Sequence, residues 1–509
     1  MTQPRIVVIG GGLAGMTVSL ELAERGFPVV LLEASDRLGG KAGSNLVDGR
    51  HYDHGYHVFP GWYRNTRRLL RQLGLQSHLI DVDRVHYVKP GEFPRLHTLW
   101  ELSSLRNAWR NLRSGLVPWY EAVLASYYAL DLSSTSFSRR SYLDRVSANG
   151  YLRSRPYATE GVAAAHEAFV LQASSIPNYE ISAMTAKRIT ESWFRVRTPI
   201  FSILDGSLQE TFIQPFQEKL RALRVNVALG QRVQRLIVNG DRVLRVVPEG
   251  AGPALTIAPD DRVVLATPHE VAFGLVDPAL YAAEERKSSY PASEKRLSDL
   301  VHLRSAPMAA MHVRFRRRIP EIPREHTVLM GSRYQLSFVD VSQHWQGLDH
   351  TLLSIIASDF WPLRDLSETA MRQELLGELL DYLSPVVRPA DIDPGAISLF
   401  PNVTVPLFLN TVGAWSYRPN TKTRLANLYV AGDYCRTQVD LTTMESAVSS
   451  GLSTAGRILG DLGNSATVTP LPLETWPRPL MRALALALLP GMVALGIAAR
   501  TWEQWGGAA

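Results

Sequence analysis

A glycine-rich loop between an apolar strand and a helix constrains the fold more than any other feature of the sequence. The segment Ile6–Ile9 contains only isoleucine and valine, as expected of a strand buried in a parallel sheet. The loop Gly10–Gly15 reads GGGLAG and leads into a helix predicted over Met16–Glu24. A second strand, Val29–Leu32, runs into Glu33. This order of elements is the βαβ fingerprint of a Rossmann-type dinucleotide site, and it predicts an α/β fold.

Each glycine of the loop has its own physical role. Gly10 permits the tight turn after the strand, and Gly15 lets the helix and the strand pack closely. Gly12 lets the backbone approach a pyrophosphate at the helix N-terminus, where free N–H groups and the helix dipole favour anions. The carboxylate of Glu33 can accept hydrogen bonds from a ribose diol, and it disfavours NADP because it would repel a 2′-phosphate. The contacts predicted from the loop are Gly10, Gly12, Leu13, Ala14 and Gly15.

The residues after the second strand extend the fingerprint. Glu33–Lys41 reads EASDRLGGK, which supplies two glycines for close backbone approach and two cations beside a diphosphate. This extension resembles the flavin-containing amine oxidase superfamily, whose members hold FAD. The resemblance implies that Arg37 and Lys41 flank the pyrophosphate. The FAD contacts implied here are Glu33, Ala34, Arg37, Gly39, Gly40 and Lys41.

Two later segments are similar to the parts of the superfamily's FAD domain that return to the cofactor. The first comprises a predicted helix and four predicted strands, over Glu210–Leu223, Val225–Leu229, Val233–Val238, Val243–Val247 and Val263–Ala266. The resemblance places the backbone of Val233 near the adenine and adds Thr267 as a contact. In the second, a strand ends at Gly432 and Asp433, and a helix begins at Met444. The resemblance implies that Asp433 binds the ribityl or phosphate region and that Met444 lies beside the flavin, where a helix dipole stabilises the reduced form.

The block Asp53–Asn65, which reads DHGYHVFPGWYRN, indicates the branch of the superfamily. It resembles a stretch of the plant-type phytoene desaturases and ζ-carotene desaturases, and Lys41 also matches that branch. Hydroxysqualene dehydroxylases form a sister group, and the sequence is also compatible with membership in that group. The resemblance implies transfer of a hydride from an allylic carbon to flavin N5 and loss of a proton from the neighbouring carbon.

Such a reaction needs an apolar tunnel more than it needs a strong base, because the intermediate cation is delocalised along the chain. Aromatic candidates for substrate contact are Phe59, Trp62, Trp415 and Tyr417, although each is also typical of a plain core residue. His57 is the candidate proton acceptor, since histidine exchanges protons near neutral pH. A hydrogen-bonded histidine that only shapes the flavin pocket is the alternative.

The three FAD-like segments are separated along the chain, so the domains are expected to be discontinuous. We predict a Rossmann-like FAD-binding domain from residues 1–90, 200–275 and 400–465. An inserted α+β substrate domain is predicted from residues 91–199 and 276–399. Residues 466–509 form an apolar tail, which is uncharged from Ala483 to Ala499 and carries Pro490 in its middle.

Three structures remain open for the tail: a helix in the membrane interface, a segment packed on protein, or a true span. A second segment also favours contact with a lipid surface, because leucine and tryptophan recur at helical spacing with arginines between them. Its residues are Leu102, Leu105, Arg106, Trp109, Arg110, Leu112, Arg113 and Leu116. The net charge of +6 suits an anionic membrane, and no motif supports nucleic-acid binding.

The sequence therefore predicts an FAD-dependent oxidoreductase that desaturates a long apolar isoprenoid at a membrane surface, with a quinone or dioxygen as electron acceptor. Alternatives are a hydroxysqualene dehydroxylase-like enzyme, an amine oxidase or protoporphyrinogen oxidase-like enzyme, and a non-enzymatic lipid-binding protein like the Rab GDP-dissociation inhibitors. One cysteine excludes a multi-cysteine metal centre, and no metal site is predicted. No signal peptide is expected, so we predict a cytoplasmic protein associated peripherally with the membrane.

Overall fold

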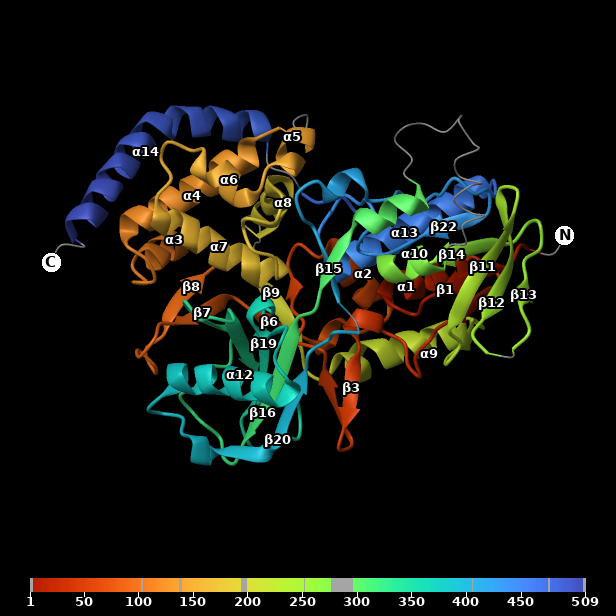
Figure 1. The fold of residues 1–509 in the computed structure, drawn as a ribbon, viewed down its shortest axis with the longest axis horizontal. Coiled ribbons are helices and arrows are strands. Elements are labelled where there is room, and N and C mark those ends of the chain that lie inside the picture. The colour runs from red at the N-terminus through yellow and green to blue at the C-terminus, as the bar shows by residue number, and fades with distance from the viewer. Residues whose placement is uncertain are drawn as a thin grey trace.

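The computed structural model describes residues 3–101, 104–136, 140–193, 199–250, 252–275, 296–404, 406–474 and 477–506. A five-stranded parallel sheet occupies the half of the molecule that contains the N-terminus (Figure 1). Its strands, in spatial order, are β10 (Asn226–Ala228), β2 (Val29–Leu32), β1 (Ile6–Ile9), β14 (Arg262–Leu265) and β22 (Leu428–Val430). Segments far apart in the sequence therefore meet in one sheet, and their carboxyl ends share one edge.

Helices and a small antiparallel sheet pack around these strands. Helix α1 (Leu13–Ala23) packs against α13 (Met444–Asp461) and α9 (Gln214–Ala222). A small antiparallel sheet contains β11 (Val233–Asn239), β12 (Arg242–Pro248) and β13 (Leu255–Thr256). Val7 and Ile9 of β1 share an apolar core with this sheet. Both faces are thus covered, which explains why β1 contains no polar residue.

The helices differ in detail from those predicted. Helix α1 begins at Leu13 rather than Met16, because Gly12 is its N-cap and the glycine loop is part of the first turn. The helix predicted over Glu210–Leu223 is a π-helical turn, Gln209–Ile213, followed by α9. Pro215 in the first turn of α9 lacks an N–H group, so the regular helix can begin only at this point.

A separate, seven-stranded sheet forms the second large sheet of the molecule. In spatial order it contains β20 (Ile392–Phe400), β16 (Ala309–Phe315), β19 (Leu352–Ala357), β18 (Leu336–Asp340), β17 (Thr327–Leu329), β7 (Arg84–Val88) and β8 (His97–Trp100). Helix α12 (Glu368–Leu383) shares an apolar core with this sheet. Strand β7 belongs to it, although the sequence assigned residues up to 90 to the cofactor domain.

A group of helices covers one end of the second sheet (Figure 1). They are α3 (Leu105–Leu112), α4 (Trp119–Ser134), α5 (Arg140–Arg145), α6 (Ala148–Arg153), α7 (Glu160–Ser174) and α8 (Ala183–Trp193). Side-chain caps define several starts: Thr159 accepts a hydrogen bond from Val162 at the start of α7. The basic amphipathic helix expected from Leu102 to Leu116 is present in part as α3. Leu102 lies outside the described residues.

The tail is one long helix, α14 (Arg478–Gly506), which bends in its middle and lies along the outside of the helical group (Figure 1). Pro490 lies inside it and removes one backbone hydrogen bond, which accounts for the bend. The Tyr127 hydroxyl of α4 donates to the Ala485 carbonyl, and Arg500 donates to the carbonyl of Ala158. Residues 478–502 are long and apolar enough to cross a membrane, but the helix also packs on protein, and 11% of its most apolar stretch is buried.

Candidate cofactor and substrate site

The glycine loop has the geometry that its sequence predicts. Gly10 has φ of +107°, and a Cβ added there would lie 2.5 Å from the Ala266 carbonyl oxygen. A Cβ on Gly15 would lie 2.0 Å from the Gly10 carbonyl oxygen. By contrast, a Cβ on Gly12 would meet nothing within 4 Å. The loop is therefore packed against protein at Gly10 and Gly15 and open at Gly12, where a ligand can approach the backbone.

The first turn of α1 favours an anion. No side chain caps it, and it contains no acidic residue, so its N–H groups and its dipole face the loop opening. The second glycine pair lies beside it, because Gly39 donates a backbone hydrogen bond of 2.9 Å to the Gly11 carbonyl. Gly40 also has positive φ, at +55°. Two glycine segments thus form one cradle, which fits a diphosphate.

Glu33 is anchored at the end of β2. Its Oε2 accepts a hydrogen bond of 2.6 Å from the Gly11 N–H, and its Oε1 accepts from the Ser35 N–H. Its own carbonyl accepts from the Gln231 N–H, which brings the segment that leads into β11 next to the backbone of Glu33. Ala34 next to it is exposed. The predicted contacts of an adenosine moiety are therefore assembled from two chain segments.

Cations and an acid extend the cradle. Lys41 Nζ lies 3.8 Å from Asp433 Oδ2, and both side chains are only partly buried. Asp433 follows β22 and Gly432, so this pair joins the first segment of the chain to the last. Arg37 donates to Asn45 Oδ1 at 2.7 Å. The hydroxyl oxygen of Thr267, after β14, is buried without a hydrogen-bond partner among the described residues, as expected of a group that faces a ligand.

Helix α13 begins at Met444, the residue predicted beside the flavin, and Thr443 caps it through the Ser446 N–H. The next residue, Glu445, is completely buried and holds α13 against α2 (Arg64–Gln72). Its carboxylate accepts hydrogen bonds from the backbone N–H groups and side chains of Asn65 and Thr66. Desolvation raises the pKa of Glu445, while these four bonds oppose that shift. Its role was missed because its partners lie far away in the sequence.

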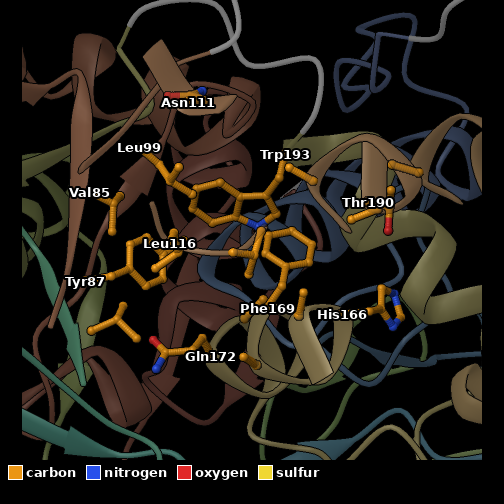
Figure 2. Close-up of a pocket in the computed structure, with 18 of the residues that line it drawn as sticks. Val85, Tyr87, Leu99, Asn111, Leu116, His166, Phe169, Gln172, Thr190 and Trp193 are labelled. Carbon is orange, nitrogen blue, oxygen red and sulfur yellow. The ribbon is translucent and has the colours of Figure 1, made fainter. Parts of the chain in front are cut away.

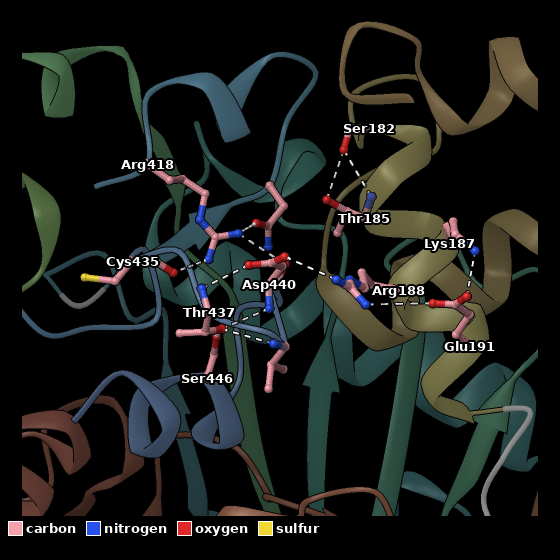
Figure 3. A network of polar contacts seen from close by, with 12 residues as sticks. Ser182, Thr185, Lys187, Arg188, Glu191, Arg418, Cys435, Thr437, Asp440 and Ser446 are labelled. Carbon is pink, nitrogen blue, oxygen red and sulfur yellow. Dashed lines mark hydrogen bonds and ion pairs between the residues drawn. The ribbon is translucent and has the colours of Figure 1, made fainter. Parts of the chain in front are cut away.

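A buried arginine, also missed, fixes the loop after Asp433 (Figure 3). Arg418 is 1% exposed and donates to the backbone carbonyls of Asp433, Tyr434, Cys435 and Asp440, and to Asn410 Oδ1. Burial lowers its pKa, and nearby Asp440 opposes that shift. The Asp440 carboxylate lies 3.7 Å from Arg188 of α8, which links the cofactor loop to the helical group.

The block Asp53–Asn65 contacts both large parts of the molecule, because Tyr56 bonds to the region of the second sheet and Asn65 bonds to Glu445 of α13. Tyr56 bonds to His326 and Ser337 of the second sheet region, both at 2.6 Å. His57 Nδ1 lies 2.8 Å from the Gly55 carbonyl, so Nδ1 carries the proton and Nε2 keeps a free lone pair. Burial lowers the pKa of His57, which keeps the ring neutral at neutral pH.

A cavity of about 970 Å³ lies beside this block (Figure 2). Its walls come from α3, α4, α7, α8, the β7–β8 pair, the second sheet and α14. Tyr56 and Val58 reach it from one side, and Leu488 and Met492 of α14 from another. The volume is at the upper end for ligand pockets and suits a long, apolar molecule. Glu101 is the single carboxylate among the described residues of the wall.

The four predicted substrate aromatics do not line this cavity. Phe59 is fully buried against Phe212. Trp62 packs on Tyr63 and Trp193. Trp415 lies under the guanidinium groups of Arg140, Arg418 and Arg436, and Tyr417 packs on His302. Their contact with substrate therefore stays a prediction, and the aromatic residues that do reach the cavity include Tyr87, Trp100, Phe169 and Trp193.

The sequence profile of a family described as flavin containing amine oxidoreductase matches residues 13–459. The chain belongs to this family. It is 27% identical over 477 residues to a 15-cis-phytoene desaturase of an Oncidium hybrid cultivar, covering 90% of this chain and 78% of the relative. A zeta-carotene desaturase of Synechocystis is 24% identical over 507 residues, with 90% and 97% covered.

Solved structures of other proteins share the fold. A putrescine oxidase superimposes with a TM-score of 0.66 at 16% identity, covering 90% of this chain and 99% of that one. A putative protoporphyrinogen oxidase from Exiguobacterium gives 0.62 at 19% identity, with 91% and 100% covered. These findings confirm the α/β fold and the superfamily, and they identify the chain as a flavin-dependent oxidoreductase rather than a non-enzymatic carrier. Among the described residues, no cluster of His, Cys, Asp and Glu could hold a metal ion.

Proposed function

We propose that this flavoenzyme uses FAD to desaturate a long apolar isoprenoid of the carotenoid type, which it takes up at a membrane surface. The apolar cavity beside the Asp53–Asn65 block carries this proposal, together with the similarity to phytoene and zeta-carotene desaturases. When bound, FAD accepts a hydride from the substrate and passes both electrons to a quinone or to dioxygen. One proton leaves the neighbouring carbon, and a double bond forms.

The residues of the chain hold and orient the reactants. The Gly10–Gly15 loop and the Gly39–Gly40 turn bind the diphosphate, and Glu33 binds the adenosine ribose. Lys41 and Asp433, which lie 3.8 Å apart, would flank the middle of the dinucleotide, and the start of α13 at Met444 would stabilise the reduced flavin. The cavity walls align the apolar chain and exclude water, so binding energy fixes one carbon–hydrogen bond against the flavin.

His57 is the proposed proton acceptor. Its Nδ1–H is tied to the Gly55 carbonyl, so its orientation and its tautomer are fixed and Nε2 can accept the proton. A strong base is unnecessary, because the β-proton of a delocalised carbocation is already acidic. The effect of removing His57 is therefore expected to be modest.

Exposed apolar side chains support the membrane part of the proposal. On α14 the exposed residues include Leu480, Leu484, Leu486, Leu488, Ile497 and Trp502. Leu488 is 41% exposed and also lines the cavity, so one side chain lies both at the surface and at the cavity wall. On α3, Leu105 and Trp109 are exposed beside Arg106 and Arg113, which suits anionic headgroups. We propose that the enzyme binds the cytoplasmic face of a membrane through these two helices.

An amine oxidase activity is less well supported by the cavity. A polyamine needs several carboxylate partners, whereas Glu101 is the one carboxylate on the described wall, and it already accepts a hydrogen bond from Asn107. The test is a panel of phytoene, hydroxysqualene and polyamines incubated with the purified enzyme and a quinone. We expect the isoprenoids to be oxidised and the polyamines to be inert. Oxidation of polyamines alone would overturn the proposal, and released flavin other than FAD would overturn its cofactor part.

A further inference from the structure

The wall of the cavity contains polar groups that the proposed hydrocarbon chemistry does not use. His166 of α7 and Tyr128 of α4 are 7% and 2% exposed, and both line the cavity. Their rings meet edge to face, with centroids 4.8 Å apart. Figure 2 shows His166 beyond Phe169, at the side of the cavity near Thr190. We call these two residues the His166–Tyr128 pair.

The polar atoms of this pair make no well-formed hydrogen bond within the described protein. Both ring nitrogens of His166 and the hydroxyl of Tyr128 are buried without a hydrogen-bond partner. The Asn178 side chain lies close to the His166 ring, and its interaction with the ring opposes the effect of burial on the pKa of His166. Asn178 can therefore serve one ring nitrogen after a small adjustment, which leaves the other ring nitrogen and the Tyr128 hydroxyl without a partner. Leaving several buried donors and acceptors unpaired costs free energy, so such groups indicate a ligand or ordered water.

The chemistry of the pair defines what it can bind. Burial lowers the pKa of His166 to about 4, so the ring is neutral and offers one donor and one acceptor. Tyr128 adds a hydroxyl that donates or accepts, and burial also raises its pKa, so it stays protonated. A neutral oxygen suits this set, whereas a carboxylate or an amine would meet no opposite charge here.

We propose that the cavity binds a long apolar molecule bearing one neutral oxygen, a hydroxyl or a carbonyl, and that the His166–Tyr128 pair hydrogen-bonds this oxygen. The inference rests on the proposed function for the apolar part of the ligand. The oxygen has two possible sources: the lipid that is oxidised, or a prenylated quinone that accepts the electrons. In either case one end of the ligand is fixed, which sets the register of the chain along the cavity.

The test compares an alcohol with the hydrocarbon that lacks only its oxygen, and adds a quinone as the second candidate ligand. Binding of geranylgeraniol, of the hydrocarbon with the same carbon chain, and of decylubiquinone to the detergent-solubilised holoenzyme is followed by tryptophan fluorescence, because Trp100 and Trp193 line the cavity. We expect an oxygen-bearing ligand to bind about tenfold more tightly than the hydrocarbon, the size of one net hydrogen bond. Preference for the alcohol identifies the lipid as the source, and preference for the quinone identifies the acceptor.

Variants locate the effect. Tyr128→Phe removes only the hydroxyl and is expected to reduce the preference, because His166 alone then hydrogen-bonds the oxygen. Tyr87→Phe, which removes a hydroxyl from another wall of the same cavity, is the matched control and should keep the preference. Equal binding of all three ligands by the unaltered enzyme, or equal effects of the two variants, would show that the pair is merely hydrated and would overturn the inference. If ligands bind as expected but no isoprenoid reduces the flavin, the proposed function fails and the inference stands.

Discussion

The cofactor cradle and the substrate cavity are built on opposite principles. The cradle consists of backbone N–H groups and glycines whose spacing is set within short segments, because a diphosphate is recognised by close approach to the main chain. The cavity is lined by side chains from seven or more elements, and no short segment supplies most of the wall. Recognition of a phosphate therefore leaves a local motif in the sequence, whereas recognition of an apolar chain does not.

The largest expected effect comes from removing the buried arginine that fixes the loop after Asp433. Arg418→Met removes five hydrogen bonds from the loop after Asp433 and leaves Asp440 without one of its cationic neighbours. We expect a loss of about 3–5 kcal/mol in the free energy of unfolding and weaker FAD retention. Denaturant unfolding and the flavin-to-protein ratio measure both. Arg457→Met, at a half-exposed ion pair on α13, is the control and should change stability by less than about 0.5 kcal/mol.

The next prediction concerns the cradle alone. Gly15→Ala places a methyl group against the Gly10 carbonyl oxygen, which is backbone and cannot move aside. We expect the free energy of unfolding to fall by about 3 kcal/mol and the purified protein to lose its flavin. Gly460→Ala in α13 is the matched control, since nothing lies within 4 Å of that position. It should stabilise the protein by about 0.5–1 kcal/mol, and full flavin occupancy in both variants would contradict the cradle.

The sequence revealed the cradle in detail and the cavity hardly at all, for physical reasons. Gly10, Gly15 and Glu33 act through local geometry, so their spacing was sufficient. Arg418 was missed because its acceptors are mostly backbone carbonyls, which every residue has. In the block Asp53–Asn65 the sequence suggested Phe59 and Trp62 for substrate contact, yet Tyr56 and Val58 face the cavity whereas Phe59 packs into the core. Side-chain direction in such an irregular segment is set by tertiary packing, which the local sequence does not encode.

A third prediction tests the outer surface of the cavity region. Replacing Leu480, Leu484 and Leu486 together by serine removes exposed apolar area from α14 without touching the cavity. We expect binding to anionic phospholipid vesicles to fall about 100-fold, while flavin content stays unchanged. Co-sedimentation measures this. Leu46→Ser, at a leucine that is 63% exposed on the β3–β4 hairpin (Ser44–Val47 and Arg50–Asp53), should leave binding unaltered. Equal binding by all three proteins would show that α14 is not a membrane contact.

The smallest effect is expected for the proposed proton acceptor, His57. His57→Gln should lower kcat about tenfold and leave KM for the lipid unchanged, because His57 receives a proton but does not hold the substrate. In the unaltered enzyme the pKa of His57 is lowered by burial, so the base is neutral and active above that pKa. Activity should therefore be flat around neutral pH and decline only in acid, as the pH falls through the lowered pKa. A kcat unaffected by the substitution would assign His57 a purely structural role.

The central claim is that the flavin in the cradle is reduced by an apolar molecule in the cavity. Its most direct test is anaerobic mixing of the purified holoenzyme with phytoene in detergent, while the absorbance of oxidised flavin is recorded and the extracted lipid is analysed by mass spectrometry. We predict that the flavin is bleached and that a product lighter by two hydrogen atoms accumulates in proportion. A flavin that stays oxidised with phytoene and every other long isoprenoid, yet is bleached by amines, would contradict the account.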